Sequence, residues 1–174
     1  MKNIFYYHTN IGLIGIAEED NQITNLFFES DICHDQNLST CSKDSEYAEK
    51  KGYYHQETDL LQEASRQLYE YLEGKRKTFI LPLAPSGTDF MKNIWKCLCD
   101  IPYGKTKSYK AIAQAVGNVK ACRAVGHANN RNPIPIFIPC HRVIGENGKL
   151  IGYRGGLETK LQLLELEKTI LSEE

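Results

Sequence analysis

The sequence predicts an α+β protein with a strand-rich N-terminal domain and a mainly helical C-terminal domain. Residues 4–28 alternate between apolar and polar side chains and are rich in Ile, Phe, Tyr and Leu, as is typical of strands. After Pro85, apolar residues recur at helical spacing in several separate segments. Pro82 and Pro85 lie between the two patterns. We therefore place the domain boundary there, with domains over residues 1–84 and 85–174.

The N-terminal domain is expected to contain hairpin-connected strands and one helix. Breaks at residues 10–12 and 20–21 divide the strands, and the second break is a hairpin turn. Residues 30–57 are polar and show no sustained period, which predicts a connecting segment with at most one short strand or turn. Thr58 is suited to cap a helix that continues to Glu73, where a glycine follows as a stop signal.

The C-terminal domain is expected to contain a helix-turn-helix. Thr88 starts a helix that ends before Pro102, because proline cannot continue it. Ser108 is placed to cap a helix over residues 109–116, and a short glycine-containing turn separates this helix from another over about residues 120–129. Two short helices joined by such a turn are typical of a helix-turn-helix.

The second helix of this pair should present a slim, outward-facing surface. Arg123 has few apolar neighbours at helical spacing, so its side chain should project outward. Small residues keep the helix narrow: Ala121, Ala124, Gly126 and Ala128. Such a helix can approach another surface closely.

Length and composition limit the class of protein. The chain has 174 residues, 41% hydrophobic and 25% charged, enough for one or two small domains with a core. No run approaches the roughly 20 apolar residues of a membrane span, and the N-terminus lacks the apolar centre of a signal peptide, so we expect a cytoplasmic protein without a membrane partner. The six cysteines form no CxxC pair, which favours reduced thiols over a zinc site or disulfides. Cys33, His34 and Cys41 give only a weak indication of metal binding.

Charge is distributed unevenly along the chain. The net charge is −1, but residues 101–145 contain seven basic residues and no acidic one, a charge of +7. The remainder contains 14 basic and 22 acidic residues. A local basic face on an acidic body is typical of a protein that presents one side to a phosphate backbone, although a solvated surface would have the same composition.

The segment over residues 134–145, IPIFIPCHRVIG, holds the candidate reactive group. Its two prolines exclude helix and favour a rigid, extended strand leading to Cys140. An unbridged cysteine often simply packs. Here, however, His141 supplies a base and Arg142 a positive charge next to a thiol whose ordinary pKa is about 8.5. Neighbouring side chains on a strand point to opposite faces, so Cys140 and His141 can act together only if the backbone turns or a water bridges them.

Glu167 is the second informative residue. In a final helix that starts at Leu157, Glu167 has leucine or isoleucine at all four neighbouring helical positions, whereas Glu165 has mostly polar neighbours. We therefore expect Glu167 to be buried, and a buried carboxylate needs a partner. His141 is the obvious candidate, and Lys160 or an arginine is the alternative.

Several segments together carry a resemblance to a known family. They are LPLAPSGTDFMKNIW, IPYGKTKSYKAIA, RAVGHA, NPIPIFIPCHRVIG and GKLIGYRGGLETKLQLLELE, which cover about residues 81–167, half of the chain. This pattern resembles the O6-alkylguanine-DNA alkyltransferase family, and PCHRV is its most specific part. Residues before 81 fit the family's strand-rich domain only loosely. Val119 departs from the family pattern, where proline often starts the second helix of the pair.

The resemblance implies the roles of five catalytic residues. Cys140 would be the methyl acceptor, His141 its base through a water, and Glu167 the carboxylate that orients His141. Asn132 would brace the turn between the helix-turn-helix and the cysteine. Tyr109 would donate a hydrogen bond to the guanine as its oxygen leaves.

The resemblance also implies a DNA-binding surface. Arg123 would fill the gap left by a guanine turned out of the base stack, and Tyr153 would line the base pocket. The substrate- and DNA-binding set is Arg123, Tyr153, Arg154, Gly155, Ala124 and Ser108. The partner would be double-stranded DNA containing O6-alkylguanine, bound through its minor groove, where a slim helix fits best.

The chemistry follows from the position of the lesion. An alkyl group on the guanine oxygen lies inside the duplex, so the base must be turned out, at a few kcal/mol, before a nucleophile reaches it. Displacement by a thiolate requires no metal or other cofactor. The thioether product has no easy leaving group, so each protein molecule should act once. We expect the protein to be a monomer. Two alternatives remain open: a DNA-damage recognition or regulatory protein with an inert cysteine, and a cysteine hydrolase, for which no oxyanion-hole motif is recognisable.

Overall fold

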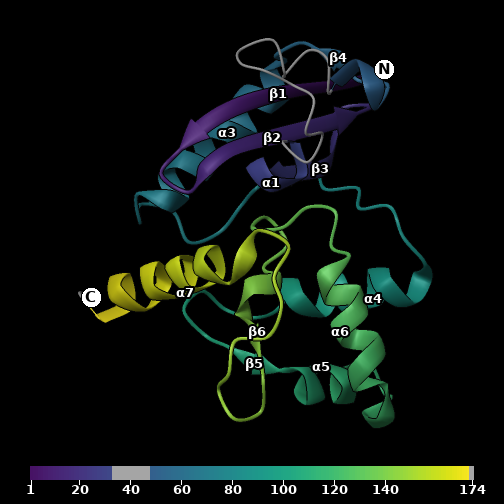
Figure 1. The fold of residues 1–174 in the computed structure, drawn as a ribbon, viewed down its shortest axis with the longest axis vertical. Helices are drawn as coiled ribbons and strands as arrows, with labels where there is room; N and C mark the ends of the chain where they lie inside the picture. Colours follow the sequence, from purple (N-terminus) through teal and green to yellow (C-terminus); the bar gives the residue numbers. More distant parts are fainter. Residues whose placement is uncertain (33–47, 173–174) are drawn as a thin grey trace. The chain divides into compact units, whose positions relative to one another are not determined.

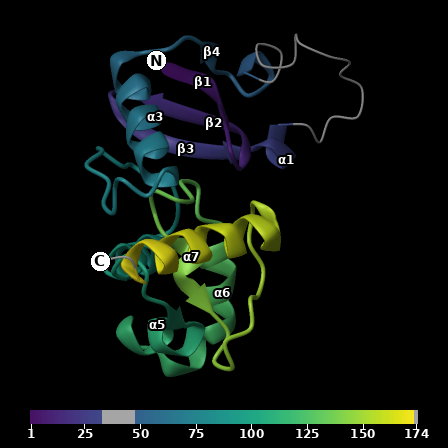
Figure 2. The ribbon, with the colours of Figure 1, turned by 90° about the vertical axis from the view of Figure 1, so that its left-hand side faces the viewer.

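A computed structural model describes residues 1–32 and 48–172 of the chain. The chain divides into two compact units, Met1–Pro85 and Ser86–Glu174 (Figures 1 and 2). The first unit is rich in strands and the second is mainly helical, as the α+β prediction requires. No helix among the described residues is both long and apolar enough to cross a membrane.

The N-terminal unit contains a four-stranded sheet in the order β3-β2-β1-β4. The first three strands form antiparallel hairpins, and β4 pairs with β1 in parallel. Asp20 and Asn21 connect β2 to β3 with φ angles of 51° and 59°, the left-handed conformation that a tight hairpin turn requires. The predicted hairpin is therefore confirmed. The strands are β1 (Lys2–Thr9), β2 (Gly12–Glu19), β3 (Gln22–Phe28) and β4 (Tyr54–His55).

One long helix covers a face of this sheet, as Figure 2 shows. Helix α3 (Asp59–Leu72) begins where expected, because the Thr58 side chain accepts a hydrogen bond from the backbone N–H of Leu61. The apolar side of α3, including Leu68 and Tyr71, is buried. The polar stretch before it contains the short helix α1 (Glu29–Ile32) as well as β4. The weak metal indication at Cys33, His34 and Cys41 lies outside the described residues.

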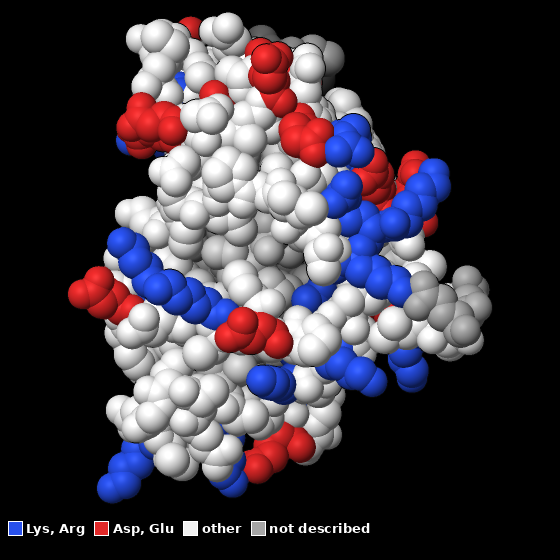
Figure 3. Space-filling model, turned by 180° about the vertical axis from the view of Figure 1, so that it is seen from behind, with Lys and Arg blue, Asp and Glu red and all other residues white. Residues whose placement is uncertain are grey.

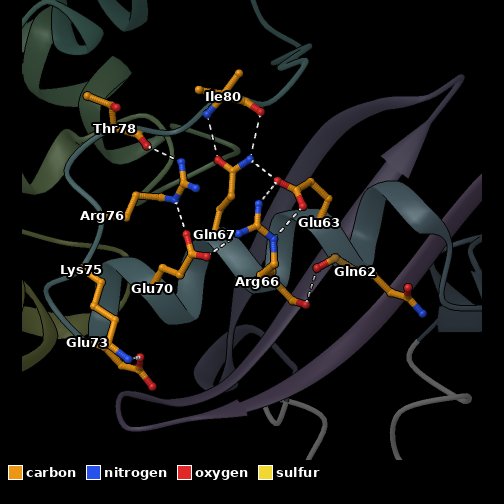
Figure 4. A network of polar contacts seen from close by, with 11 residues as sticks. Gln62, Glu63, Arg66, Gln67, Glu70, Glu73, Lys75, Arg76, Thr78 and Ile80 are labelled. Carbon is orange, nitrogen blue, oxygen red and sulfur yellow. Dashed lines mark hydrogen bonds and ion pairs between the residues drawn. The ribbon is translucent and has the colours of Figure 1, made fainter.

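A network of polar contacts attaches the chain after α3 to the helix itself (Figure 4). The Gln67 side chain exchanges two hydrogen bonds with the backbone of Ile80, at 2.8 and 3.0 Å. Arg76 donates to the Glu70 carboxylate at 2.7 Å and to the carbonyl of Thr78 at 3.1 Å. These contacts hold residues 76–80 against the helix.

The C-terminal unit is built from four α-helices, two short 3-10 helices and a two-stranded parallel sheet formed by β5 and β6. The predicted helix at Thr88 is present, and Thr88 caps it by accepting a hydrogen bond from the N–H of Met91. Ser108 caps α5 as predicted, by accepting from the N–H of Ala111. The elements are α4 (Asp89–Cys99), β5 (Lys107–Ser108), α5 (Tyr109–Ala115), η1 (Val119–Ala121), α6 (Cys122–Asn130), η2 (Cys140–Arg142), β6 (Val143–Ile144) and α7 (Gly156–Ser172).

The predicted helix-turn-helix is present as α5 and α6. Its second helix begins with the 3-10 turn η1, and Asn118, which precedes that turn, makes no side-chain capping bond. Helix α6 is anchored on its inner side, because the Trp95 indole donates a 2.9 Å hydrogen bond to the carbonyl of Ala128 and Val125 is fully buried. The opposite side of α6 remains exposed.

The strand expected to lead into Cys140 is absent, and this prediction was wrong. Residues 134–138 form a turn, with Ile136 at a φ of 73° and a hydrogen bond from the N–H of Ile138 to the carbonyl of Ile134. Cys140 itself begins the 3-10 helix η2. The prolines exclude α-helix as argued. However, the backbone conformations that they allow are compatible with a turn as well as with a strand.

Candidate active site

Cys140 lies at the start of η2 and exposes only 2% of its surface. Burial raises the pKa of its thiol to about 11, while a hydrogen bond with Asn132 and the positive charges of Lys160 and Arg154 act in the opposite direction. At neutral pH the resting group is therefore a thiol, and a base must remove its proton before the sulfur can act as a strong nucleophile.

Asn132 braces the turn that precedes Cys140. Its amide donates a 2.9 Å hydrogen bond to the carbonyl of Ile138, and its amide oxygen accepts a 3.0 Å bond from the N–H of Ile134. From the end of α6, Asn129 adds a 3.3 Å bond to the carbonyl of Cys140 itself. Two buried asparagines thus connect the cysteine segment to the end of α6, the second helix of the helix-turn-helix.

His141 and Glu167 are in direct contact, one of the partnerships considered from the sequence. The two residues are fully buried, and His141 Nε2 lies 2.8 Å from Glu167 Oε1. The turn at η2 permits this arrangement, because it rotates His141 away from the alternating geometry of a strand. Burial of Glu167 and exposure of Glu165 on the same helix both follow the neighbour pattern in the sequence.

Arg142 is the second partner of Glu167, which revises its expected role as a charge beside the thiol. Its Nε lies 3.1 and 3.0 Å from the two carboxylate oxygens, and its Nη2 lies 2.9 Å from Oε1. Arg142 also donates to the carbonyl of Ile101 at 2.7 Å, and the backbone N–H of Gly104 donates to Glu167 Oε2 at 2.8 Å. The carboxylate of Glu167 therefore lies among donors from two separate segments, residues 141–142 and Gly104.

These contacts determine the charge states of the group. Burial alone would raise the pKa of Glu167, but the hydrogen bonds from His141 and Arg142 and the positive charge of Arg142 outweigh it and hold that pKa at about 2. Burial lowers the pKa of His141 from its ordinary value of 6.5, although Glu167 opposes the change. The arrangement at neutral pH is an ionised carboxylate, a guanidinium and a neutral imidazole.

The sequence reasoning considered Lys160 only as an alternative partner for Glu167, and the structure gives it another position. Lys160 exposes 0% of its surface, and its ammonium group donates to the carbonyl oxygens of Val143, Ile151 and Gly152 at 2.6, 3.2 and 3.4 Å. The neighbour pattern that identified Glu167 could have found it, because Leu157, Leu163 and Leu164 stand at its helical neighbour positions.

The expected base-pocket residues lie on the loop that leads into α7. Tyr153 is 9% exposed, and its ring meets the His141 ring edge-on at 6.5 Å. Arg154 and Gly155 are half-buried, and Arg154 reaches the carbonyl of Asn132 at 3.5 Å. The hydroxyl of Tyr109 donates a 2.9 Å hydrogen bond to the carbonyl of Ile151 on the same loop.

Tyr109 and Ser108 stand at the start of α5, near this loop. Burial and the neighbouring Cys140 raise the pKa of Tyr109, so its hydroxyl keeps its proton at neutral pH. Ser108 is half-buried and uses its hydroxyl as the helix cap, through the 3.1 Å bond from Ala111. On α6, Arg123 and Ala124 are exposed, and the expected outward direction of Arg123 is confirmed.

The basic segment is less uniform than its charge of +7 indicates. Arg142 is internal and bound to Glu167, and Lys110 pairs with Glu146 at 3.1 Å. On the face of the whole molecule drawn in Figure 3, basic and acidic side chains are both exposed. Six basic residues of the segment are exposed, Lys110 among them: Lys105, Lys107, Lys110, Lys120, Arg123 and Arg131. Among residues 1–32 and 48–172, no group of three or more His, Cys, Asp or Glu side chains is arranged to hold a metal ion.

Two family models match almost the whole chain. Residues 4–85 match the ribonuclease-like domain of 6-O-methylguanine DNA methyltransferase, and residues 89–169 match the DNA-binding domain of the same protein. The chain belongs to this methyltransferase family. The resemblance read from residues 81–167 is confirmed, and the loosely fitting N-terminal half belongs to the family as well.

Relatives in this family are similar along most of their length. The constitutive methylated-DNA–protein-cysteine methyltransferase of Bacillus subtilis is 47% identical over 161 residues, which covers 92% of each chain. A Methanosarcina barkeri protein of the same name is 60% identical over 112 residues, which covers 64% of this chain and 71% of the relative.

Solved structures of this family have the same fold. The O6-methylguanine methyltransferase of Mycobacterium tuberculosis is 38% identical, with a TM-score of 0.81 over 97% of this chain and 94% of the other. A structure titled as OGT of the same organism in complex with DNA is 37% identical, with a TM-score of 0.82 over the same shares of the two chains.

Proposed function

We propose that this protein repairs DNA by transferring the alkyl group of O6-alkylguanine to the sulfur of Cys140, once per molecule. Membership of the methyltransferase family supports this reaction class. The observation that carries the assignment to Cys140 is the buried pair formed by the next residue of the chain, in which His141 Nε2 lies 2.8 Å from an ionised Glu167. A cysteine that only packed would have no need of a neutral base held by a buried carboxylate.

Glu167 determines which nitrogen of His141 acts as the base. An ionised carboxylate can only accept hydrogen bonds, so His141 Nε2 must carry a hydrogen and donate it. The lone pair then lies on Nδ1, which removes the proton of Cys140, directly or through a bridging water. The resulting imidazolium is stabilised by the carboxylate that already binds it.

The transfer step then balances without any other reactant. The Cys140 thiolate attacks the alkyl carbon, the new carbon–sulfur bond forms as the carbon–oxygen bond breaks, and the electron pair passes to the guanine. A proton returned to the guanine completes the reaction, and Tyr109, which is protonated at neutral pH, would assist by donating a hydrogen bond. In the free protein this hydroxyl donates to Ile151, so it must turn toward the base.

The DNA side of the reaction is assigned to α6 and the loop before α7. Arg123 and Ala124 are exposed on a narrow helix, which suits entry into a minor groove and replacement of a base turned out of the stack. Tyr153, Arg154 and Gly155 would line the pocket that receives the guanine. Because Cys140 is only 2% exposed, movement of this loop during base entry is part of the proposal.

The remaining assignments extend the same proposal. The C-terminal unit would bind DNA and carry the acceptor cysteine. The protein would act as a monomer in the cytoplasm, through the minor groove.

The proposal is tested by the mass of the Cys140 peptide. After incubation with a duplex carrying a single O6-methylguanine, we expect that peptide to gain one methyl group, with one transfer per protein molecule, and we expect Cys140→Ser to abolish the gain. Cys99→Ser, which changes an exposed cysteine of the same unit, is the control and should transfer normally. Several turnovers per molecule, or methylation elsewhere in the chain, would contradict the proposal. Binding to DNA without transfer would favour the recognition-protein alternative.

A further inference from the structure

Arg142 is a buried cation for which the reaction described above has no use. It exposes 6% of its surface, so it is not placed to contact DNA or the guanine. Its guanidinium donates to the carbonyl of Ile101 at 2.7 Å and lies 5.7 Å from the centre of the Tyr103 ring. Any effect of Arg142 on the transfer must therefore pass through neighbouring protein groups.

Arg142 and His141 share one carboxylate oxygen. His141 Nε2 lies 2.8 Å from Glu167 Oε1, and Arg142 Nη2 lies 2.9 Å from the same atom. Glu167 Oε2 accepts from Arg142 Nε at 3.0 Å and from the N–H of Gly104 at 2.8 Å. The imidazole of His141 is thus bound to a carboxylate whose charge is already balanced by a guanidinium, and a guanidinium does not lose its proton in proteins.

The charge of this buried group determines whether His141 takes up a proton. With His141 neutral, Glu167 and Arg142 form a pair without net charge. A proton on His141 would leave the buried group with a net positive charge, which is costly away from water. Without the charge of Arg142, the same proton would instead cancel the charge of Glu167 and form a buried ion pair. In agreement, burial lowers the pKa of His141, Glu167 opposes that change, and Arg142 adds to it.

The protonation state of His141 decides whether this residue can act as the base. An imidazolium has no lone pair, so it cannot remove the proton of Cys140. We propose that Arg142 is a positioning residue for the transfer, which balances the charge of Glu167 and so keeps His141 unprotonated and able to accept the thiol proton. This inference rests on the proposed function and deepens it.

Other titratable groups also face His141 and Arg142. The charge of Lys160 lowers the pKa of His141 as well, but its ammonium group donates to backbone carbonyls, whereas Arg142 contacts the carboxylate that binds His141. The groups around the pair are Cys140, Glu167, Lys160, the rings of Tyr153 and Tyr103, and the Cys99 thiol at the end of α4. Replacement of Arg142 is therefore the change that separates charge balance at Glu167 from the other influences.

The test compares three variants of the full chain. Arg142→Gln removes the charge and keeps hydrogen-bond donors, Arg142→Lys keeps the charge, and Lys168→Gln removes an exposed positive charge next to Glu167 on the same helix as a control. For each we would measure, from pH 6 to 10, the single-turnover rate of methyl transfer and the titration of His141 by NMR. The His141 signal is assigned by its absence in His141→Asn, and a thermal unfolding curve shows whether each variant folds.

We expect Arg142→Gln to displace the His141 titration and the pH profile of transfer upward by at least about one pH unit, with transfer about tenfold slower at pH 7.5 and recovering at high pH. Arg142→Lys and Lys168→Gln should keep both profiles of the parent protein. A merely structural arginine would lower the melting temperature, or the rate at every pH, without moving the His141 titration, and that result would overturn the proposal. Faster transfer by Arg142→Gln below pH 7 would also overturn it, because a protonated His141 would then favour the reaction.

The remaining outcomes are decided in advance. A protonated His141 in the parent protein at pH 7.5 overturns the proposal outright. If Arg142→Gln does not fold, the decision passes to Arg142→Lys, for which unchanged profiles support the role of charge and a displacement of a pH unit or more overturns it. If the parent transfers no methyl group while the His141 titrations separate as expected, the proposed function fails and the effect of Arg142 on His141 stands.

Discussion

Replacement of Glu167 by glutamine tests the base network most directly. The carboxylate accepts from His141, Arg142 and the N–H of Gly104, with both oxygens facing donors. A glutamine amide has only one acceptor oxygen. In either orientation, its NH2 group would therefore face donor groups of His141, Arg142 or Gly104, with which it cannot form hydrogen bonds. Arg142 also loses its buried counter-charge. We therefore expect both stability and rate to fall.

The loss of stability can be estimated from the carboxylate. Its pKa lies at about 2 rather than the ordinary 4.5, and 1.36 kcal/mol per pH unit gives about 3 kcal/mol of stabilisation at neutral pH. Breaking a buried ion pair costs a similar amount, about 3–5 kcal/mol. Because the folded-state pKa is depressed, this stabilisation is complete above pH 4.5 and is lost as the pH falls toward 2. Glu167→Gln should lower the melting temperature by about 10 °C at pH 7.5 and remove this acid sensitivity.

The rate should fall for a separate reason. In the variant, the imidazolium formed when His141 takes the thiol proton has no carboxylate to stabilise it, and general-base catalysis is worth roughly 10²–10⁴-fold. We expect single-turnover methyl transfer about 10²-fold slower at pH 7.5, with affinity for unmodified duplex nearly unchanged. Glu165→Gln, on the exposed side of the same helix, is the control and should behave as the parent. A folded Glu167→Gln variant that transfers within twofold of the parent rate would refute the role assigned to the carboxylate.

Two further predictions address DNA entry and the cysteine turn. Arg123→Ala should slow transfer from duplex DNA at least tenfold but leave transfer from the free O6-methylguanine base nearly unchanged, because an exposed side chain on α6 can act only on the duplex. Equal losses on both substrates, in parallel rate measurements, would show that Arg123 takes no part in base extrusion. Asn132→Ala should lower the free energy of unfolding by about 2–4 kcal/mol in a urea titration, because it leaves the Ile138 carbonyl and the Ile134 N–H buried without their partner. A change below about 1 kcal/mol would show that the turn is stable without the Asn132 side chain.

Local features of the chain could be read from the sequence because they depend on neighbours along it. The caps at Thr58 and Ser108 and the helix start at Thr88 were predicted correctly, since a capping side-chain oxygen bonds an N–H only three residues away. The hairpin at Asp20 and the exposure of Arg123 follow from the same kind of short-range information.

The path into Cys140 could not be read in this way. Pro135 and Pro139 exclude helix but allow either a strand or a series of turns, and the choice depends on partners. Asn132 supplies those partners with its two buried hydrogen bonds, and no pattern in the sequence indicates which backbone groups it will meet. The resulting 3-10 turn is what brings His141 to Glu167.

The sequence by itself determined the family, the acceptor cysteine proposed for it, and the burial of Glu167, because these rest on residue order and on helical spacing within one segment. Tertiary structure alone decided that Arg142 would bind Glu167 rather than act on the thiol, and that Lys160 would take a place near the sulfur. Long charged side chains can reach several partners, and burial selects among them by leaving no charge without a partner. That selection depends on distances between segments far apart in the chain, and only the folded structure contains them.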